Sequence, residues 1–189
     1  MGKRAGWIIL IFVVLAMVQL TYIFLALMEL HSSKPAFAQD DENNRRTLRG
    51  LRGVNVVIEF LKPQVKGERL TEDWLRADTE LRLRGAGIEV LSERENQMTP
   101  GRPSLYINVN ILKYRYIPVY VYKSSLELVQ DVYLVRAFEI RTGAVTWSVS
   151  TTGVAPKVED VRTSMGELLD YFVNAYLSAN PKERDAHEG

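Results

Sequence analysis

The chain of 189 residues is nearly neutral, because 24 lysines and arginines face 23 acidic residues, and such a domain is not expected to bind nucleic acid. It contains no cysteine, which excludes disulfides, thiolate nucleophiles, cysteine-ligated metals and a lipid anchor on cysteine. The two histidines, His31 and His187, lie outside the segment expected to fold, so we predict neither a histidine-based triad nor a zinc site.

An apolar segment over residues 7–28 opens the chain and is interrupted by only two polar residues. As a helix it would be roughly 33 Å long at ~1.5 Å per residue, which is enough to cross a bilayer. Lys3 and Arg4 precede the segment and Glu29 follows it, so the positive-inside rule places the rest of the chain outside the cytoplasm. Residues 1–38 are therefore predicted to be a transmembrane anchor or a signal peptide.

The fate of this leader leaves two alternatives open. If it is retained, the protein is a single-pass inner-membrane protein with a cytoplasmic N-terminus and a periplasmic domain. If a signal peptidase cleaves after Ala38, where Ala36-Phe37-Ala38 has the A-x-A pattern, the domain is soluble in the periplasm. The apolar run is longer than the ~7–15 residues of a typical signal core, which favours the anchor.

Residues 39–53 are polar and show no apolar period, so they are predicted to be a linker. Arg45, Arg46 and Arg49 gather there, either as part of a solvated linker or as a contact for anionic lipid head groups or an acidic partner. The folded domain is expected over residues 54–180. The charged residues 181–189 are expected to form a disordered tail.

The first half of the domain is predicted to be a strand, a helix and a short strand. Alternating apolar residues indicate a strand over residues 54–61, and a second, short strand follows at residues 88–91. Thr71 is placed to cap a helix between them, and residues 96–103 are expected to be a loop. The apolar stripe of that helix is predicted to comprise Trp74, Ala77, Leu81 and Gly85.

Three strands are predicted for the second half. Alternation indicates strands over residues 105–111, 120–134 and 145–149, with turns at residues 114–119 and 141–143.

A long closing helix follows and stops at Asn180-Pro181. Its stripe steps by three and four residues through Val158, Val161, Met165, Leu168, Phe172, Ala175 and Ala179. The order β-α-β-β-β-β-α predicts an α+β fold: a mostly antiparallel sheet of about five strands with two helices packed on one face.

Three stretches carry a resemblance: residues 70–88, residues 100–110, and residues 145–149 together with the closing helix that ends at Asn180-Pro181-Lys182. Together they resemble a widespread set of small exported bacterial proteins that carry no assigned function, over nearly all of residues 51–182. The element order is also similar to the amino-terminal module of the Tol system's propeller protein and to the curli secretion-channel family. The resemblance implies an exported α+β module and brings no catalytic residues with it.

No constellation in the sequence indicates catalysis. Glu127 and Asp131 would share one face of a strand, but at ~3.3 Å per residue they lie roughly 13 Å apart, too far for a paired acid–base site. A phosphate-binding loop, a metal-ligand spacing and a nucleophile elbow are all missing from the sequence. We therefore predict that the protein is not an enzyme and that it uses no cofactor and no metal.

The most unusual stretch holds four tyrosines around one predicted turn, Tyr114, Tyr116, Tyr120 and Tyr122. They are either ordinary core and strand residues or a contact surface, since tyrosine is enriched at interfaces. We take these tyrosines, with Arg45, Arg46 and Arg49, as the candidate partner-binding residues.

The sequence thus predicts a membrane-tethered, extracytoplasmic binding or structural protein, an accessory subunit of an envelope or bioenergetic membrane complex. It would be held in the membrane through residues 7–28 and bound to a protein partner there. A soluble periplasmic ligand-binding module is the alternative, and a hydrolase without a recognisable motif comes third.

Overall fold

The computed structural model describes residues 14–22, 37–39, 41–59, 70–113 and 119–181. The chain divides into two compact units, Met1–Lys34 and Pro35–Gly189. In the first unit, residues 14–22 form a helix. Within the described ranges, no helix has the length and apolar character needed to cross a membrane. The remainder of the predicted span over residues 7–28 lies outside the described residues, so the anchor stays a prediction.

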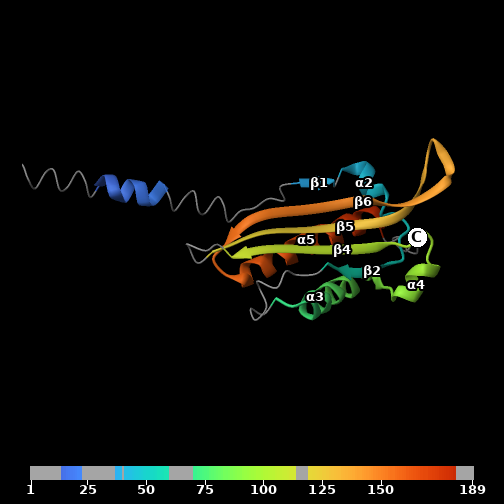
Figure 1. Cartoon of the computed structure of the whole chain (residues 1–189), viewed down its shortest axis with the longest axis horizontal. Coiled ribbons are helices and arrows are strands. Elements are labelled where there is room, and N and C mark those ends of the chain that lie inside the picture. Colours follow the sequence, from blue (N-terminus) through green and yellow to red (C-terminus); the bar gives the residue numbers. More distant parts are fainter. Residues whose placement is uncertain (1–13, 23–36, 40, 60–69, 114–118, 182–189) are drawn as a thin grey trace, which may run out of the picture. The chain divides into compact units, whose positions relative to one another are not determined.

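The second unit is an α+β domain built on a mixed sheet of six strands (Figure 1), in the order β1-β6-β5-β4-β2-β3. The strands are β1 Phe37–Gln39, β2 Gly53–Ile58, β3 Glu89–Val90, β4 Ser104–Lys113, β5 Tyr120–Leu134 and β6 Ala137–Ala155. Pairing is antiparallel from β1 through β6 and β5 to β4, and parallel between β4 and β2 and between β2 and β3. The predicted α+β class is confirmed, although the sheet is mixed, with parallel pairs on both sides of β2 that the prediction of a mostly antiparallel sheet did not include.

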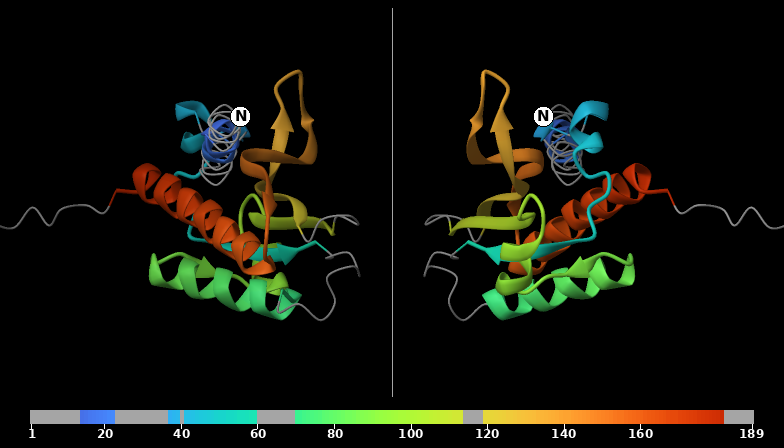
Figure 2. Two further views of the ribbon diagram at one scale, coloured as in Figure 1. Left: turned by 90° about the vertical axis from the view of Figure 1, so that its left-hand side faces the viewer. Right: turned by 90° about the vertical axis from the view of Figure 1, so that its right-hand side faces the viewer.

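Two long helices cover the buried side of this sheet. The helices of the domain are α2 Glu42–Arg46, α3 Glu72–Gly85, α4 Glu93–Met98 and α5 Val158–Ala179. The closing helix α5 contacts β5 and β6, whereas α3 contacts β2 and β3, and Figure 2 shows the two helices lying alongside each other. Both contribute to a single hydrophobic core.

The closing helix packs as its stripe predicts. Its residues Val161, Met165 and Phe172 are buried, and the Phe172 ring meets Trp147 of β6 edge-on, with 5.2 Å between ring centroids. Aromatic pairs favour this geometry, and such contacts add to the stabilisation that comes from burial. Both rings are fully buried.

The stripe predicted for α3 is wrong, except that Trp74 is partly buried against the core. The buried side chains are Leu75, Thr79 and Leu83, four residues apart, while Leu81 is 70% exposed. The predicted cap is confirmed, because the Thr71 hydroxyl accepts a hydrogen bond from the Trp74 amide at 3.2 Å. The loop expected over residues 96–103 begins instead as the end of α4, whose Ser92 forms a capping box with Glu95.

The segment predicted to be a linker, residues 39–53, folds against the domain. Its short helix α2 is capped by Asp41, whose carboxylate accepts from the Asn44 amide at 2.8 Å. Leu48 is fully buried, and its carbonyl accepts from the Asn180 side chain of the distant C-terminal end at 2.9 Å. The polar composition concealed this packing because it depends on only two leucines, Leu48 and Leu51, and on hydrogen bonds to distant residues, including Tyr176 and Asn180. Residues 182–189 of the predicted tail lie outside the described residues.

Candidate functional site

A long β-hairpin formed by β5 and β6 extends beyond the rest of the sheet (Figure 1). The pairing of β4 with β5 ends at Ser104 and Val129, whereas β5 and β6 continue to pair as far as Leu134 and Ala137. The turn of the hairpin is at residues 135–136, so the turn predicted at residues 141–143 is wrong. Residues 141–143 instead pair as strand with residues 131–133. Their composition tolerates a turn but does not require one.

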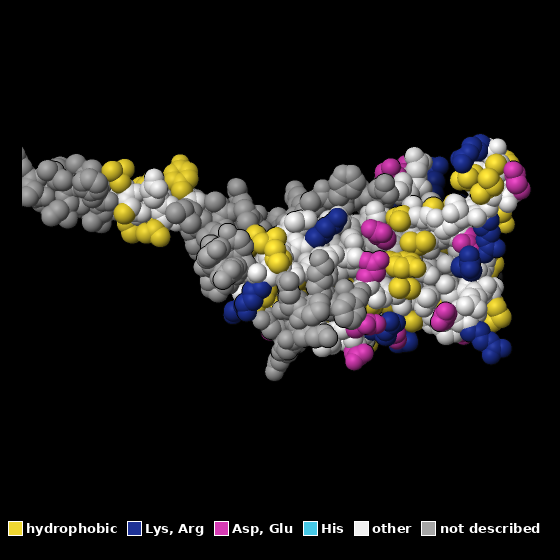
Figure 3. Space-filling model, in the orientation of Figure 1, with side chains coloured by type: hydrophobic (Ala, Val, Ile, Leu, Met, Phe, Trp, Pro, Cys, Tyr) yellow, Lys and Arg dark blue, Asp and Glu magenta, His cyan; other side chains and the backbone are white. Residues whose placement is uncertain are grey.

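Apolar side chains are exposed on this projection. We call residues 133–140 the hairpin tip. Tyr133, Val135, Phe138 and Ile140 are between 44% and 83% exposed there. Figure 3 shows hydrophobic side chains gathered on the hairpin with charged side chains beside them. Contiguous exposed apolar groups are uncommon on soluble domains and indicate a contact surface.

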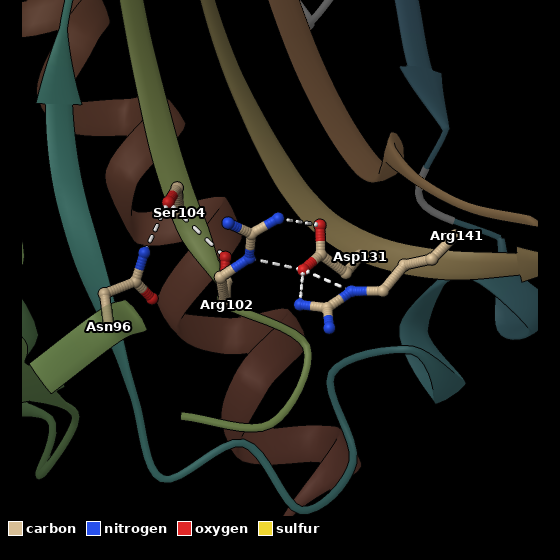
Figure 4. Close-up of polar contacts among 5 residues, drawn as sticks. All are labelled: Asn96, Arg102, Ser104, Asp131 and Arg141. Carbon is tan, nitrogen blue, oxygen red and sulfur yellow. Dashed lines mark hydrogen bonds and ion pairs between the residues drawn. The ribbon is translucent and has the colours of Figure 1, made fainter. Parts of the chain in front are cut away.

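A charged cluster fastens the base of the hairpin (Figure 4). Asp131 of β5 accepts hydrogen bonds from Arg102, with Nε–Oδ2 at 2.5 Å and Nη2–Oδ1 at 3.0 Å. Arg141 of β6 donates to the same carboxylate, with Nε–Oδ2 at 2.9 Å, and the Asp131 amide donates to the Gly101 carbonyl at 2.7 Å. The cluster therefore ties both strands of the hairpin to the turn that precedes β4.

The charges of this cluster stabilise the base of the hairpin and are poorly suited to proton transfer. Hydrogen bonds from Arg102, and then from Arg141, lower the pKa of Asp131 to about 2, and the same contact raises the pKa of Arg102. The Asp131 side chain is only 10% exposed, and both of its oxygens are occupied. A carboxylate in this state is ionised at neutral pH and is a poor general acid or base.

The turn before β4 directs Arg102 toward this carboxylate. Gly101 has φ 78° and Arg102 has φ 41°, so two successive residues adopt the left-handed region, which only glycine enters at little cost. The Arg102 amide donates to the Thr99 carbonyl at 3.0 Å, which closes the turn. Sequence reasoning missed Arg102, since no local signal connects it with an aspartate 29 residues further on.

A polar hollow of about 890 Å³ lies beside the cluster, between β2, α3, α4 and the start of β4. Asn96 lines it and is 7% exposed. Its amide nitrogen donates to the Ser104 hydroxyl at 3.0 Å, while its Oδ1 is buried without a hydrogen-bond partner among the described residues. Glu95 at the rim has a lowered pKa, because the Ser92 amide and hydroxyl bond to its carboxylate. The hollow could hold a polar ligand, and the described residues include no cluster suited to a metal ion.

The predicted tyrosines do not form the expected surface where the structure describes them. Tyr120 and Tyr122 are buried in the core, and the Tyr122 ring lies over Gly153, where an added Cβ would be 2.8 Å from Oη. These two rings are therefore core residues, which corrects the prediction for them. Tyr114 and Tyr116 lie outside the described residues.

The predicted arginines do come together. Arg45, Arg46 and Arg49 line a shallow hollow of about 480 Å³ beside the end of α5, and Arg46 pairs with Glu42 at 2.7 Å. Their segment packs near the hairpin base, because Gln130 donates to the Thr47 carbonyl at 3.2 Å. The tyrosines of β5 lie at the opposite end of the strand, so the two predicted groups do not form one site.

Comparison with known proteins gives little further information. The chain matches no protein-family model and no curated protein. Among solved structures, it is similar to a variant of the PelC dodecamer from Paraburkholderia phytofirmans, with 16% identity and a TM-score of 0.35 over 66% of this chain and 88% of that one. A second PelC dodecamer from the same organism gives 15% identity and a TM-score of 0.30 over 68% and 89%. Likenesses this distant carry no argument about function.

Proposed function

We propose that the protein is a membrane-tethered, extracytoplasmic binding component, and that it recognises a protein partner of a membrane complex through its hairpin tip. The observation that carries the proposal is the exposure of Tyr133, Val135 and Phe138, each more than half exposed, on a hairpin that extends past the rest of the sheet. Much of the binding energy of protein interfaces comes from a few side chains, among which tyrosine and other aromatic residues are enriched. The tether itself rests on the apolar run over residues 7–28.

The braced base of the hairpin supports this function. A contact loop that is held in its binding conformation loses less conformational entropy when a partner binds. Asp131 supplies that restraint, because its two arginine partners come from the opposite strand and from a separate turn. The cluster thus positions the tip without taking part in the contact.

The charges at the tip favour contact with a groove in a protein over contact with a lipid surface. Arg136 and Glu139 are both exposed beside the apolar side chains. An anionic membrane would repel the glutamate, whereas a groove in a protein can present one group of each sign at its rim. The partner surface is therefore expected to be apolar at its centre and mixed in charge around it.

The test compares two pairs of substitutions in the full chain. Replacing Val135 and Phe138 by serine should abolish co-purification of the partner from detergent-solubilised membranes while the melting temperature stays close to that of the parent. Replacing Leu81, which is 70% exposed on α3, and Met98, also 70% exposed, provides a control of matched exposure that should leave co-purification intact. Equal loss of the partner in both variants, or no loss in either, would contradict the proposal that the hairpin tip binds the partner.

A second function, binding of a small polar ligand, is favoured by the unpartnered Oδ1 of Asn96 in the polar hollow. A ligand that satisfies this oxygen should shift the chemical environment of Asn96 and Ser104. Chemical-shift changes confined to the hollow on adding cell-extract metabolites, and lost in Asn96→Ala, would support this function. Their absence would leave the hollow as a structural feature.

A further inference from the structure

Three exposed apolar side chains form a row across the outer face of the sheet, at the end opposite the hairpin tip. Leu112 of β4 lies opposite Val121 of β5, and Val121 lies opposite Val154 of β6. The three are between 37% and 54% exposed. Their neighbours along the strands, Ile111 and Tyr122, are buried, so the row belongs to the face that turns away from the core.

Lysines accompany this row. Lys113 ends β4 opposite the core residue Tyr120, so it lies on the other face of the sheet, at the strand end, with its Nζ 5.4 Å from the centroid of the Tyr120 ring. Lys123 projects from the outer face, two residues beyond Val121 on β5 and opposite Asn110, and both lysines are exposed. Along β5 the first acidic side chain on this face is Glu127, four residues beyond Lys123. Figure 3 shows this grouping of hydrophobic and basic side chains at the strand ends. The row is therefore apolar, with Lys123 on its own face and Lys113 at the strand end, while the carboxylate of Glu59 lies further along β4 beside Asn108.

The N-terminal end of strand β1 points toward the end of the sheet that carries this row. Strand β1 runs antiparallel to β6, with Gln39 opposite Ser148 and Phe37 opposite Ser150. Traced backward from Gln39 to Phe37, the chain therefore heads toward Val154 and away from the hairpin tip. The row and the tip are separated by residues 137–154 of β6, which is roughly 55 Å at ~3.3 Å per residue.

We propose that Leu112, Val121 and Val154, with Lys113 and Lys123, form a surface that contacts the anionic lipid of the membrane in which the chain is anchored. This inference rests on the tether in the proposed function and adds an orientation to it. The apolar side chains enter the interfacial layer, and the lysines keep their ammonium groups at the phosphates. The domain then stands with this end at the bilayer and with the hairpin tip held away from it.

The size and charge of the row favour lipid over a second copy of the chain or another protein. Three side chains cover far less than the ~1,000 Å² that a specific protein interface requires. A membrane contact can be this small, because the anchor raises the effective concentration of the surface at the bilayer. Each lysine near an anionic surface adds electrostatic attraction, whereas two copies meeting through this row would bring like charges together.

The absence of native cysteine allows a direct test with single-cysteine variants of the full chain. Val121→Cys carries an environment-sensitive fluorophore, and the protein is reconstituted into phosphatidylcholine–phosphatidylglycerol vesicles that contain a spin-labelled lipid quencher. We expect several-fold stronger quenching at this position than in the matched variant Phe138→Cys at the hairpin tip. In vesicles of phosphatidylcholine alone, or after Lys113→Gln with Lys123→Gln, quenching at position 121 should fall.

The outcomes separate the two proposals. If the protein resists carbonate extraction but positions 121 and 138 are quenched equally, the lipid contact is wrong and the tether stands. If carbonate releases the protein from the vesicles, the tether fails and this inference fails with it. Stronger quenching at position 138 than at position 121 would reverse the orientation and overturn the inference.

Discussion

The two ends of the paired strands β5 and β6 differ in how far their apolar side chains are buried. In the middle and toward one end, α5 covers the ladder and the large side chains Leu128 and Trp147 are fully buried. At the other end the paired strands extend beyond α5, and Tyr133 and Phe138 are exposed. The alternation of apolar residues is comparable in both regions, so the packing partner, rather than the strand sequence, decides which apolar residues are core.

This comparison indicates why the exposed end is of functional interest. Apolar side chains in the covered part contribute to folding, because they leave water when the domain forms. Those at the tip remain in water and contribute little to folding. Asp131, Arg102 and Arg141 nevertheless fix the base of the tip. A braced structure with exposed apolar groups is consistent with selection for contact with another molecule.

The largest expected effect contrasts one phenylalanine from each region. Phe172→Ala removes a fully buried ring that packs on Trp147, and should lower the free energy of unfolding by on the order of 3–5 kcal/mol. Phe138→Ala at the tip should change it by less than about 0.5 kcal/mol. Urea denaturation measures both. Similar losses in the two variants would mean that the tip is packed in solution.

Two glycines provide a smaller and closely matched contrast. A Cβ at Gly153 would lie 2.8 Å from Oη of the buried Tyr122, whereas one at Gly143 in the hairpin would lie 3.6 Å from Val129 Cγ1, an ordinary contact. Gly153→Ala should therefore destabilise the domain by about 1–3 kcal/mol through overpacking, and Gly143→Ala should be nearly neutral. Thermal unfolding of both variants checks this, and a neutral Gly153→Ala would show that the Tyr122 ring has room to move.

The smallest effect concerns acid and the hairpin base. The folded pKa of Asp131 is lowered to about 2, below the value of roughly 3.9 for an unfolded aspartate. The unfolded state therefore binds the proton more readily, so the stabilisation is complete above the unfolded pKa and is lost as the pH falls through the folded pKa. Amide exchange in residues 131–144 should be slower in the parent than in Asp131→Asn at neutral pH.

That difference in exchange should shrink between about pH 5 and about pH 2, with amides of α5 as the internal control. A difference that persists unchanged at the lowest pH would mean that the charge of Asp131 does not hold the hairpin.

Sequence patterns predicted the elements whose packing is local and repetitive. The closing helix follows from a stripe that recurs through its whole length, and the bounds of β5 follow from an alternation over Tyr120–Leu134. The position of the hairpin turn did not follow, because Arg141-Thr142-Gly143 has turn-like composition but pairs as strand. Composition describes which conformations a segment tolerates, and the register of the long ladder selects among them.

The site was harder to predict than the fold because it depends on contacts between distant segments. Asp131 was singled out only as a possible partner of Glu127, while its actual partners are Arg102 and Arg141. The buried Leu48 was hidden in a polar segment for the same reason. For Tyr120 and Tyr122 the expectation of a contact surface gave too much weight to residue type, since both face the core.

The central claim, that the hairpin tip contacts a protein partner, is tested most directly by photo-crosslinking in intact cells. A photoreactive phenylalanine analogue replaces Phe138, which is 69% exposed, and in a matched control it replaces Leu81, which is 70% exposed. We predict one discrete crosslinked product of defined mass from position 138, lost when Val135 is also replaced by serine, and none from position 81. No product from position 138, or the same products from both positions, would contradict the claim.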